Sequence, residues 1–553
     1  MPFAEKIITH IRPRHNQYIV LICLLIAAFA ATGIEPGVVG LNHDDGIYVI
    51  LGKALSEGRG YRLLNLPTTP YQTKYPAVYP FLISCVWPAA DFPDNIFYIK
   101  LINILFLFLI SLETYYICLI LFDGKKNPAF YMVMLVGMSP WTLLYSIKAL
   151  SEIPFLFFSL TAALLFALSE RKQAQDRGDA VRYALYFFAI LSACLAFQTR
   201  TFGLALLMAC VLYFLVRKKY KTAVLSLLLI CVLNLPWIIW ARAHAPSADA
   251  NPLLHYYTAY SLPTHGMKSF SELMTGLKAI FFANILYLCK YGSEVISCSS
   301  IILKPLIALV WIIFLAGIWK CLKDGKYLFI LLYLAFYIMI YLYITSLPIS
   351  RLRYLIPLTP FLFMIFLTGI MAIIEQTKRF RSERPRIYFI ALIILFLLPN
   401  AAVSAKFIVF SDNKSWDGFK ETISWIKENT GQDAVLASSS DPIYYLYTGR
   451  KGLMPWFLNG KTFYLPSPKE AKPFFGGPDY SFALLQDLKA GYLIQEPLGD
   501  QALKPSMEFY QRMFKKHSNE LKPVFVSKDQ IHKIYRITGV TRDAYEKTGD
   551  KNR

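Results

Sequence analysis

The sequence predicts an α-helical polytopic membrane protein with a C-terminal extracytoplasmic α/β domain. The 553 residues are 56% hydrophobic and only 17% charged, whereas soluble globular domains have about 45–50% apolar and about 25% charged residues. The apolar residues form long runs, many of which are long enough to cross a bilayer as helices. Residues 405–553 lack such runs and carry the mixed pattern of a small soluble domain.

The apolar runs give about eleven predicted membrane helices. They cover 18–34, 98–121, 129–147, 153–169, 183–199, 202–216, 222–241, 301–319, 327–345, 354–374 and 387–404. We therefore predict a membrane domain over 1–404, interrupted by two long outer loops at about 35–97 and about 242–300. An odd number of spans puts the soluble domain, 405–553, on the opposite side of the membrane from the N-terminus.

The distribution of basic residues orients these helices. The net charge is +21, and the Lys and Arg residues gather in alternate loops, at 6–14, 125–126, 171–182, 217–221, 320–326 and 378–386. This alternation follows the positive-inside rule, and it explains the charge without a nucleic-acid partner. We therefore expect a multi-pass protein of the inner or plasma membrane, with a cytoplasmic N-terminus and an extracytoplasmic C-terminal domain.

The soluble segment alternates helix and strand signals. Apolar spacing and turn residues predict helices at 416–428, 441–447 and 506–516 and strands at 434–437, 492–495, 524–527 and 532–537. This alternation indicates a small α/β domain. In the first outer loop, helical spacing at 45–55 and an apolar stretch at 79–87 predict amphipathic helices that lie along the membrane interface.

An acidic pair follows the first predicted span, in the segment Leu41 to Tyr48. Asp44 and Asp45 lie on the outer side, close to the membrane surface. A carboxylate held near a low-dielectric wall suits a general base or a cation ligand. The alternative is a helix cap, because Asp is favoured at the start of a helix such as 46–55.

A third acid, Glu152, lies in the short outer turn before the predicted span 153–169. A carboxylate between two apolar helices must be hydrated, paired or functional. It faces the same side as the acidic pair, which makes it a second candidate for the catalytic site. The alternative is a plain helix-start residue before Pro154.

Basic residues on the outer side are few: Lys74, Arg200, Arg351 and Arg353. Fixed positive charge near the bilayer surface is what a phosphate-bearing lipid headgroup requires, and Arg offers it a bidentate partner. The alternative is that these side chains only reach toward the interface, as Lys and Arg near helix ends commonly do. The sequence thus predicts a phosphate-binding set on the outer face.

The order of these segments resembles the C-type glycosyltransferase superfamily. The resemblance rests on Asn-His-Asp-Asp-Gly-Ile-Tyr at 42–48, Lys-Tyr-Pro at 74–76, Ser-Glu-Ile-Pro-Phe at 151–155, Thr-Arg-Thr-Phe-Gly at 199–203 and Arg-Tyr-Leu-Ile-Pro-Leu-Thr-Pro at 353–360. Within the superfamily the chain is most similar to bacterial relatives of protein O-mannosyltransferases (glycosyltransferase family 39) and of the aminoarabinose transferase of lipid A. The similarity spans nearly the whole chain.

This resemblance implies a transferase that takes a sugar from a polyprenyl-phosphate donor and inverts the anomeric carbon. The acceptor would be a hydroxyl of a lipid, a glycan or a protein, in glycosylation of the cell envelope. The family's catalytic acid follows the first span, where Asp44 and Asp45 both qualify. It would activate the acceptor hydroxyl, while Lys74, Arg200 and Arg353 would stabilise charge on the leaving phosphate.

One position departs from the aminoarabinose transferase pattern. There an acid precedes the loop lysine and helps to hold a metal ion, whereas here Thr73 precedes Lys74. His43 and His255 are potential ligands, but a lone interfacial histidine is more often only hydrogen-bonded. The sequence therefore assigns no metal ligands and leaves a divalent metal open as a cofactor.

Two other functions compete with this hypothesis. A lipid-linked polysaccharide ligase or polymerase would carry catalytic basic residues and histidine in a late outer loop. A transporter or flippase of lipid-linked sugars would place ionisable residues at mid-membrane depth, and Glu113 is such a residue.

Overall fold

The computed structural model describes residues 13–171, 179–247, 252–259, 300–344, 352–376, 402, 404–405, 408, 414–455, 477–496 and 504–538. The chain divides into two compact units. The first, here called the membrane unit, comprises Met1–Glu35, Ile99–Ile239 and Lys268–Ser411. The second, called the sheet unit, comprises Pro36–Tyr98, Trp240–Met267 and Asp412–Arg553. The first predicted outer loop and part of the second thus belong to the same unit as the C-terminal segment.

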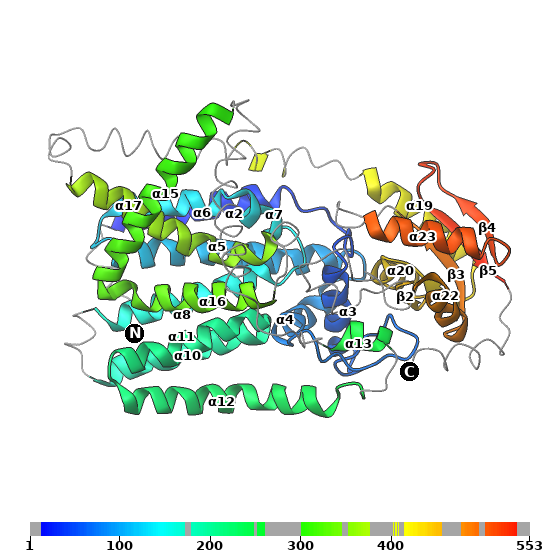
Figure 1. Ribbon diagram of the computed structural model, residues 1–553, viewed down its shortest axis with the longest axis horizontal. Coiled ribbons are helices and arrows are strands. Elements are labelled where there is room, and N and C mark those ends of the chain that lie inside the picture. The colour runs from blue at the N-terminus through cyan, green and yellow to red at the C-terminus, as the bar shows by residue number, and fades with distance from the viewer. Residues whose placement is uncertain are drawn as a thin grey trace. The chain divides into compact units, whose positions relative to one another are not determined.

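The membrane unit is built from long apolar helices (Figure 1). They are α2 (Pro13–Ala31), α5 (Asn95–Leu121), α6 (Lys126–Gly137), α7 (Pro140–Ser146), α8 (Glu152–Ser169), α10 (Asp179–Thr199), α11 (Leu204–Val216), α12 (Tyr220–Ala243), α15 (Ser300–Lys323), α16 (Leu328–Ile344) and α17 (Thr359–Gln376). Short 3-10 turns, η2 (Thr201–Gly203), η3 (Gly325–Tyr327) and η4 (Leu352–Leu358), lead into α11, α16 and α17. Helix α8 packs on α10, and α11 packs on α16.

Within the described residues, six helices are long and apolar enough to cross a bilayer, at 95–121, 152–169, 179–199, 220–243, 325–342 and 353–375. Helices α6 and α7 make a seventh if the pair, bent by 56°, counts as one span. The sequence predicted an unbroken span at 129–147; the break falls at Pro140, which cannot continue a helix. Most of the predicted span 387–404 lies outside the described residues. The predicted total of about eleven spans stays a prediction.

Large apolar side chains cover the outside of these helices. On α12, exposed side chains include Val224, Leu225, Val232 and Ile239, and α2, α10 and α15 carry similar rows. A surface of this kind is unstable in water and suits lipid, because the helices satisfy their own backbone hydrogen bonds. The membrane-protein assignment made from composition is therefore confirmed.

Helices α15 and α17 approach closely through two glycines. A Cβ added at Gly317 would collide with the backbone oxygen of Ile365, and one added at Gly369 would collide with that of Ile313. Small residues allow such approach, which is how helices gain packing contacts in lipid.

Loops that the sequence predicted to be cytoplasmic meet at one end of the membrane unit. Glu375 pairs with Lys125 at 3.2 Å and with Lys320 at 3.5 Å. Glu170, at the C-terminal end of α8, pairs with Arg217 at 3.8 Å and with Lys219 at 3.5 Å. Arg217 also donates to the Gly325 carbonyl at 2.7 Å, so these contacts bring together three of the predicted basic loops.

Glu152 lies at the other end of α8, which has 18 residues. At 1.5 Å per residue this helix is about 27 Å long, close to the thickness of about 30 Å of the hydrocarbon core. The basic loops and Glu152 are therefore separated by about one membrane thickness, as the topology prediction requires.

The sheet unit contains a five-stranded sheet with strand order β2-β1-β3-β5-β4. The strands are β1 (Val435–Ala437), β2 (Gly452–Leu453), β3 (Ala490–Gln495), β4 (Leu521–Val526) and β5 (Lys533–Ile537). Strand β1 runs parallel to β2 and β3, whereas β5 is antiparallel to both β3 and β4. The parallel connections pass through helices, and β4 and β5 form a hairpin.

Helices of the C-terminal segment accompany this sheet (Figure 1): α19 (Lys414–Asn429), α20 (Asp441–Thr448), α22 (Gly477–Asp487) and α23 (Lys504–Lys516). The core includes Phe419, Ile426, Leu436, Tyr444 and Ile534. The predicted helices and strands of this segment are confirmed to within a few residues; β2 and α22 were not predicted.

The first outer loop folds onto the C-terminal segment. It contains α3 (Asp44–Ser56), α4 (Val78–Val86) and η1 (Trp87–Ala89), and the second loop contributes α13 (Pro252–Thr258). The Tyr447 hydroxyl donates to the carbonyl of Gly37 and accepts from the amide of Val39 at 3.1 Å. At Gly46 a Cβ would meet the Pro442 side chain at 2.6 Å, so α3 and α20 pack closely. This packing places the acidic pair beside α20.

Candidate functional site

The acidic segment of the sheet unit begins in a strained turn. His43 has φ 58° and ψ −59°, and the Asp44 amide donates to the Asn42 carbonyl at 2.6 Å. A hydrogen bond from residue i+2 to residue i at positive φ defines the rarer, strained kind of three-residue turn. The turn ends where α3 begins, so His43 and Asp44 lie at the N-terminus of that helix.

The Asp45 side chain stabilises this turn from within. It is 4% exposed. Its oxygens accept 3.0 Å hydrogen bonds from the amides of Gly40, Asn42 and Gly46. A carboxylate bonded to several backbone amides acts as a local capping group.

Asp44 points to different partners. Its Oδ1 atom accepts a hydrogen bond from the Tyr75 hydroxyl at 2.7 Å. The neighbouring Lys74 ammonium donates to the Tyr256 carbonyl at 3.2 Å. Burial lowers the pKa of Lys74, and the charge of Asp44 acts in the opposite direction. The structure thus brings Asp44 and Lys74, two of the predicted site residues, into electrostatic contact.

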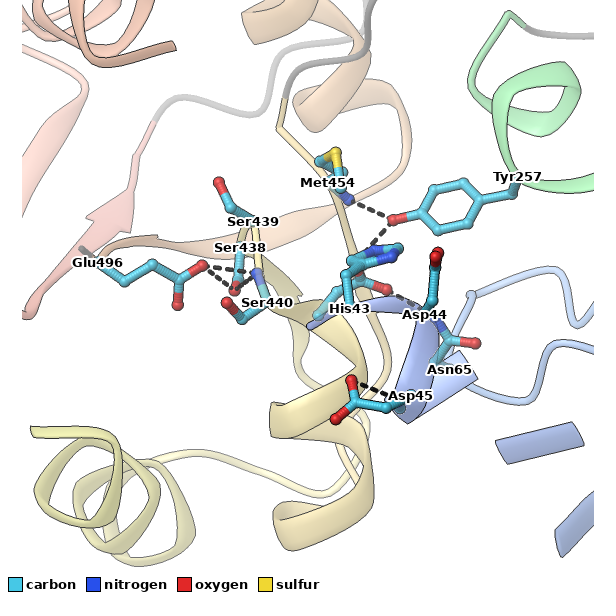
Figure 2. A network of polar contacts seen from close by, with 12 residues as sticks. His43, Asp44, Asp45, Asn65, Tyr257, Ser438, Ser439, Ser440, Met454 and Glu496 are labelled. Atoms are coloured by element: carbon cyan, nitrogen blue, oxygen red, sulfur yellow. Dashed lines mark hydrogen bonds and ion pairs between the residues drawn. The ribbon is translucent and has the colours of Figure 1, made fainter. Parts of the chain in front are cut away.

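Asp441, at the N-terminus of α20, is a buried acid that connects three segments of the chain. Its Oδ1 atom lies 3.2 Å from His43 Nε2 and accepts from the Tyr257 hydroxyl at 2.8 Å. Its Oδ2 atom accepts from Asn65 Nδ2 at 2.6 Å. The Tyr257 hydroxyl in turn accepts from the Met454 amide at 3.1 Å. Figure 2 shows His43, Asn65 and Tyr257 in this network, with Asp44 beside them.

The network changes the acid–base chemistry of His43. Burial disfavours the imidazolium, but the hydrogen bond and charge of Asp441, together with the charge of Asp44, outweigh burial and raise the pKa of His43. Lys74 opposes this rise. The pair is therefore an imidazolium and a carboxylate over a wider pH range than a solvated histidine allows.

A second buried acid lies on the other side of the α20 N-terminus (Figure 2). Glu496 follows β3, and its Oε1 atom accepts from Ser438 Oγ at 2.9 Å and from the Ser440 amide at 2.6 Å. Burial raises the pKa of Glu496 to about 7, against the effect of these hydrogen bonds. Both hydrogen-bond donors belong to the C-terminal segment.

The membrane unit holds a separate cluster of charges. Glu152 is fully buried and pairs with Arg200 Nη1 at 2.8 Å and with Arg353 Nε at 3.4 Å. Arg200 also donates to Ser151 Oγ at 3.0 Å and lies over the Tyr354 ring. The cluster carries two positive charges against one negative. Arg351 lies outside the described residues.

The predicted site residues therefore fall into two groups, each within its own unit. Asp44, Asp45 and Lys74 lie in the sheet unit, and Glu152, Arg200 and Arg353 lie in the membrane unit. Sequence reasoning missed Asp441, which it took for a helix start, although the Asp441-Pro442 pair is a usable signal for a carboxylate at a helix N-terminus. Over the described ranges, no three His, Cys, Asp or Glu residues form a group that could hold a metal ion.

No protein-family model and no curated protein matches this sequence. Solved structures do match it. ArnT from Cupriavidus metallidurans, bound to undecaprenyl phosphate, is 11% identical with a TM-score of 0.58, over 96% of this chain and 99% of that one. In the apo state ArnT gives 10% identity and a TM-score of 0.57 over 95% of this chain and 98% of that one.

The archaeal oligosaccharyltransferase AglB from Archaeoglobus fulgidus matches as well. In complex with an inhibitory peptide and a dolichol-phosphate it is 12% identical, with a TM-score of 0.58, over 95% of this chain and 74% of that one. At these identities the likeness shows a shared fold. It confirms the fold expected from the resemblance to C-type glycosyltransferases.

Proposed function

We propose that the protein is a membrane glycosyltransferase that moves a sugar from a polyprenyl-phosphate donor to an acceptor hydroxyl on the extracytoplasmic side. The observation that carries the proposal is the likeness in fold to ArnT over nearly the full length of both chains. That ArnT structure contains undecaprenyl phosphate, and the AglB structure contains a dolichol-phosphate. Both are polyprenyl-type lipids that end in a phosphate, the leaving group that this reaction requires.

Asp44 is the proposed general base. Its carboxylate takes the proton of the acceptor hydroxyl while the acceptor oxygen forms a bond to the anomeric carbon and the bond from that carbon to the lipid phosphate oxygen breaks. A single displacement of this kind inverts the anomeric carbon. Asp44 is favoured over Asp45 because the Asp45 oxygens are occupied by backbone amides.

The basic residues are proposed to stabilise the phosphate that leaves. Lys74 supplies positive charge in the sheet unit, and Arg200 and Arg353 supply it in the membrane unit; Arg351 joins this set on the sequence prediction alone. Preorganised positive charge in a site of low dielectric stabilises a developing anion without reorganisation. A guanidinium also matches a phosphate bidentately.

Glu152 keeps a place in the proposed site, with a role set by its partners. It is paired with two arginines, which already balance its negative charge. We assign it the task of fixing the direction of Arg200 and Arg353, because a buried carboxylate between two guanidinium groups restricts both.

The reaction is proposed to occur outside the cytoplasm, in the cell membrane. The support is the cluster of basic loops at one end of the membrane unit and Glu152 at the other end of α8. A protease added to sealed spheroplasts should cleave within 414–538, whereas tags inserted near Lys125 should stay protected. Protection of the C-terminal segment would reverse the topology and remove every proposed catalytic group from the outer face.

The function is tested with purified full-length protein reconstituted into sealed proteoliposomes. A panel of undecaprenyl-phosphate-linked sugars, radiolabelled in the sugar, is incubated with the protein, and transfer to an acceptor or to water is measured. We expect one donor to lose its sugar, and the Asp44→Asn variant to leave that donor intact. Movement of the intact lipid-linked sugar across the bilayer without cleavage would indicate a flippase, and transfer of a whole glycan chain a ligase or polymerase.

A further inference from the structure

The turn that presents Asp44 does not hold its shape by local preference. His43 has a positive φ of 58°, a region that residues with a side chain rarely adopt, and the three-residue turn around it is strained. Strained backbone persists only where surrounding contacts fix it, and it concentrates at functional sites. The groups that hold this turn therefore bear on how Asp44 is presented.

Two carboxylates hold the turn, one near it in sequence and one far from it. Asp45 binds the amides around it and is local to the turn. Asp441 binds the His43 ring and comes from a position 398 residues further along the chain. Asp441 is fully buried, whereas the His43 side chain keeps 25% of its surface exposed. The buried acid thus anchors a histidine whose ring still reaches the surface beside Asp44.

We propose that Asp441 is a positioning residue of the candidate active site: through His43 it fixes the strained turn that presents Asp44. The inference rests on the proposed function, because it takes Asp44 as the base. It gives the C-terminal segment an indirect part in catalysis, through the position of Asp44. Without Asp441, the first outer loop would keep its sequence but lose the turn geometry at Asp44.

The charges that face His43 make the pair sensitive to pH. They are Asp441 on α20, Asp44 on α3 and Lys74 on the following loop. The neutral Tyr257 hydroxyl on α13 binds the same Asp441 oxygen as His43 does. When the Asp441 charge is removed, burial and Lys74 still lower the pKa of His43, and only the charge of Asp44 still raises it. The pKa of His43 should then fall, which reports on the contact independently of any transfer reaction.

Two substitutions separate the shape of this contact from its charge. Asp441→Asn keeps the size of the side chain and one acceptor oxygen for His43 and Tyr257. Its new amide group would face Asn65, whose Oδ1 atom is buried without a hydrogen-bond partner among the described residues, so rotation of the Asn65 amide restores a bond. Asp441→Ala removes both shape and charge.

Glu496→Gln is the matched control. Glu496 is also a buried acid beside the α20 N-terminus, and it accepts hydrogen bonds from Ser438 and Ser440, which lie outside the first outer loop. Gln retains the Oε1 acceptor of these bonds. The variant therefore alters a buried acid of the same unit without removing a partner of His43, whose titration midpoint should be unchanged.

The experiment uses full-length protein in nanodiscs with isotopically labelled histidine, and His43→Gln assigns the His43 signal. We expect a lower His43 titration midpoint in both Asp441 variants and an unchanged midpoint in Glu496→Gln. With the donor that the wild type accepts, Asp441→Ala should lower kcat by at least about tenfold, the effect of one charged hydrogen bond, with donor KM changed less than about twofold. Asp441→Asn should lower kcat by a smaller factor than Asp441→Ala.

An unchanged His43 midpoint in Asp441→Ala, or equal losses of kcat in Asp441→Ala and Glu496→Gln, would overturn the proposal. If the wild type transfers no sugar from any donor, the proposed function fails. The midpoints still decide whether Asp441 holds His43, because they are measured without substrate.

Discussion

Asp44 and Asp45 are neighbours in sequence, but their carboxylates bind different groups. Asp44 Oδ1 accepts a hydrogen bond from the Tyr75 hydroxyl at 2.7 Å. Asp45 is 4% exposed and is bound by three backbone amides. The structure thus distinguishes two acids that spacing alone left equivalent, and it gives each a separate test.

Asp45→Asn should destabilise the sheet unit. The new amide group has donors where the carboxylate accepts from Gly40 or from Asn42 and Gly46, so at least one buried amide loses its partner. An unsatisfied buried donor costs about 1–3 kcal/mol. We expect a lower Tm in a thermal unfolding assay. An unchanged Tm together with lost transfer would instead make Asp45 the base.

Arg200→Ala should reduce stability more than Arg353→Ala. Arg200 is closer to Glu152, 2.8 Å against 3.4 Å, and its side chain is 9% exposed against 27%. Removing one partner of a buried ion pair costs about 3–5 kcal/mol. The measurement is Tm in detergent, with donor KM determined in parallel. Lys at either position should restore donor use only in part, because it lacks the guanidinium fork.

Lys125→Ala is the control for these variants. The Lys125–Glu375 pair lies among the basic loops at the other end of the membrane unit, and both side chains are at least half exposed. Exposed pairs contribute about 0–1 kcal/mol, so Tm should barely change. Equal shifts in all three variants would indicate that Glu152 and its arginines are not a specially stabilised cluster.

Donor binding should weaken with rising pH because of Lys74. Burial lowers the pKa of this side chain below its ordinary value of 10.5, so its ammonium loses its proton at a lower pH than that of a solvated lysine. Since only the charged form attracts the donor phosphate, donor KM should rise within the alkaline range. Lys74→Arg should remove this dependence, because Arg stays protonated. The same rise in the Arg variant would assign it to another group.

Stability should fall with rising pH because of Glu496. Burial raises its pKa from 4.5 to about 7. Between these values the unfolded chain releases the proton while the folded protein keeps it, so rising pH favours unfolding; above about pH 7 the effect is constant. The difference corresponds to roughly 3 kcal/mol. Glu496→Gln should remove this part of the pH dependence of Tm, and identical pH profiles would contradict the assignment.

The sequence predicted most of the elements because their signals are local. Apolar runs identify membrane helices from composition alone, and α20 was predicted from Asp441-Pro442 at its start and Gly449 at its end. The bend between α6 and α7 was missed, although Pro140 marks it. Two-residue β2 is too short to show alternation.

The network around Asp441 was beyond sequence reasoning. Asn65 and His43 lie 376 and 398 residues away from it, and Tyr257 comes from a third segment. No spacing rule in a single sequence connects positions so far apart. The grouping of the first outer loop and part of the second with the C-terminal segment was hidden for the same reason, since it depends on packing between distant segments such as Gly46 against Pro442.

The measurement that tests the central claim most directly is sugar release from the accepted donor by Asp44→Asn, with donor binding and Tm measured in the same preparation. Removal of a positioned general base costs about 10²–10⁴ in rate, while Asn keeps the size and capping ability of Asp. The account predicts a loss of that size in kcat with near-normal donor affinity and Tm. Transfer at the wild-type rate by Asp44→Asn would contradict it.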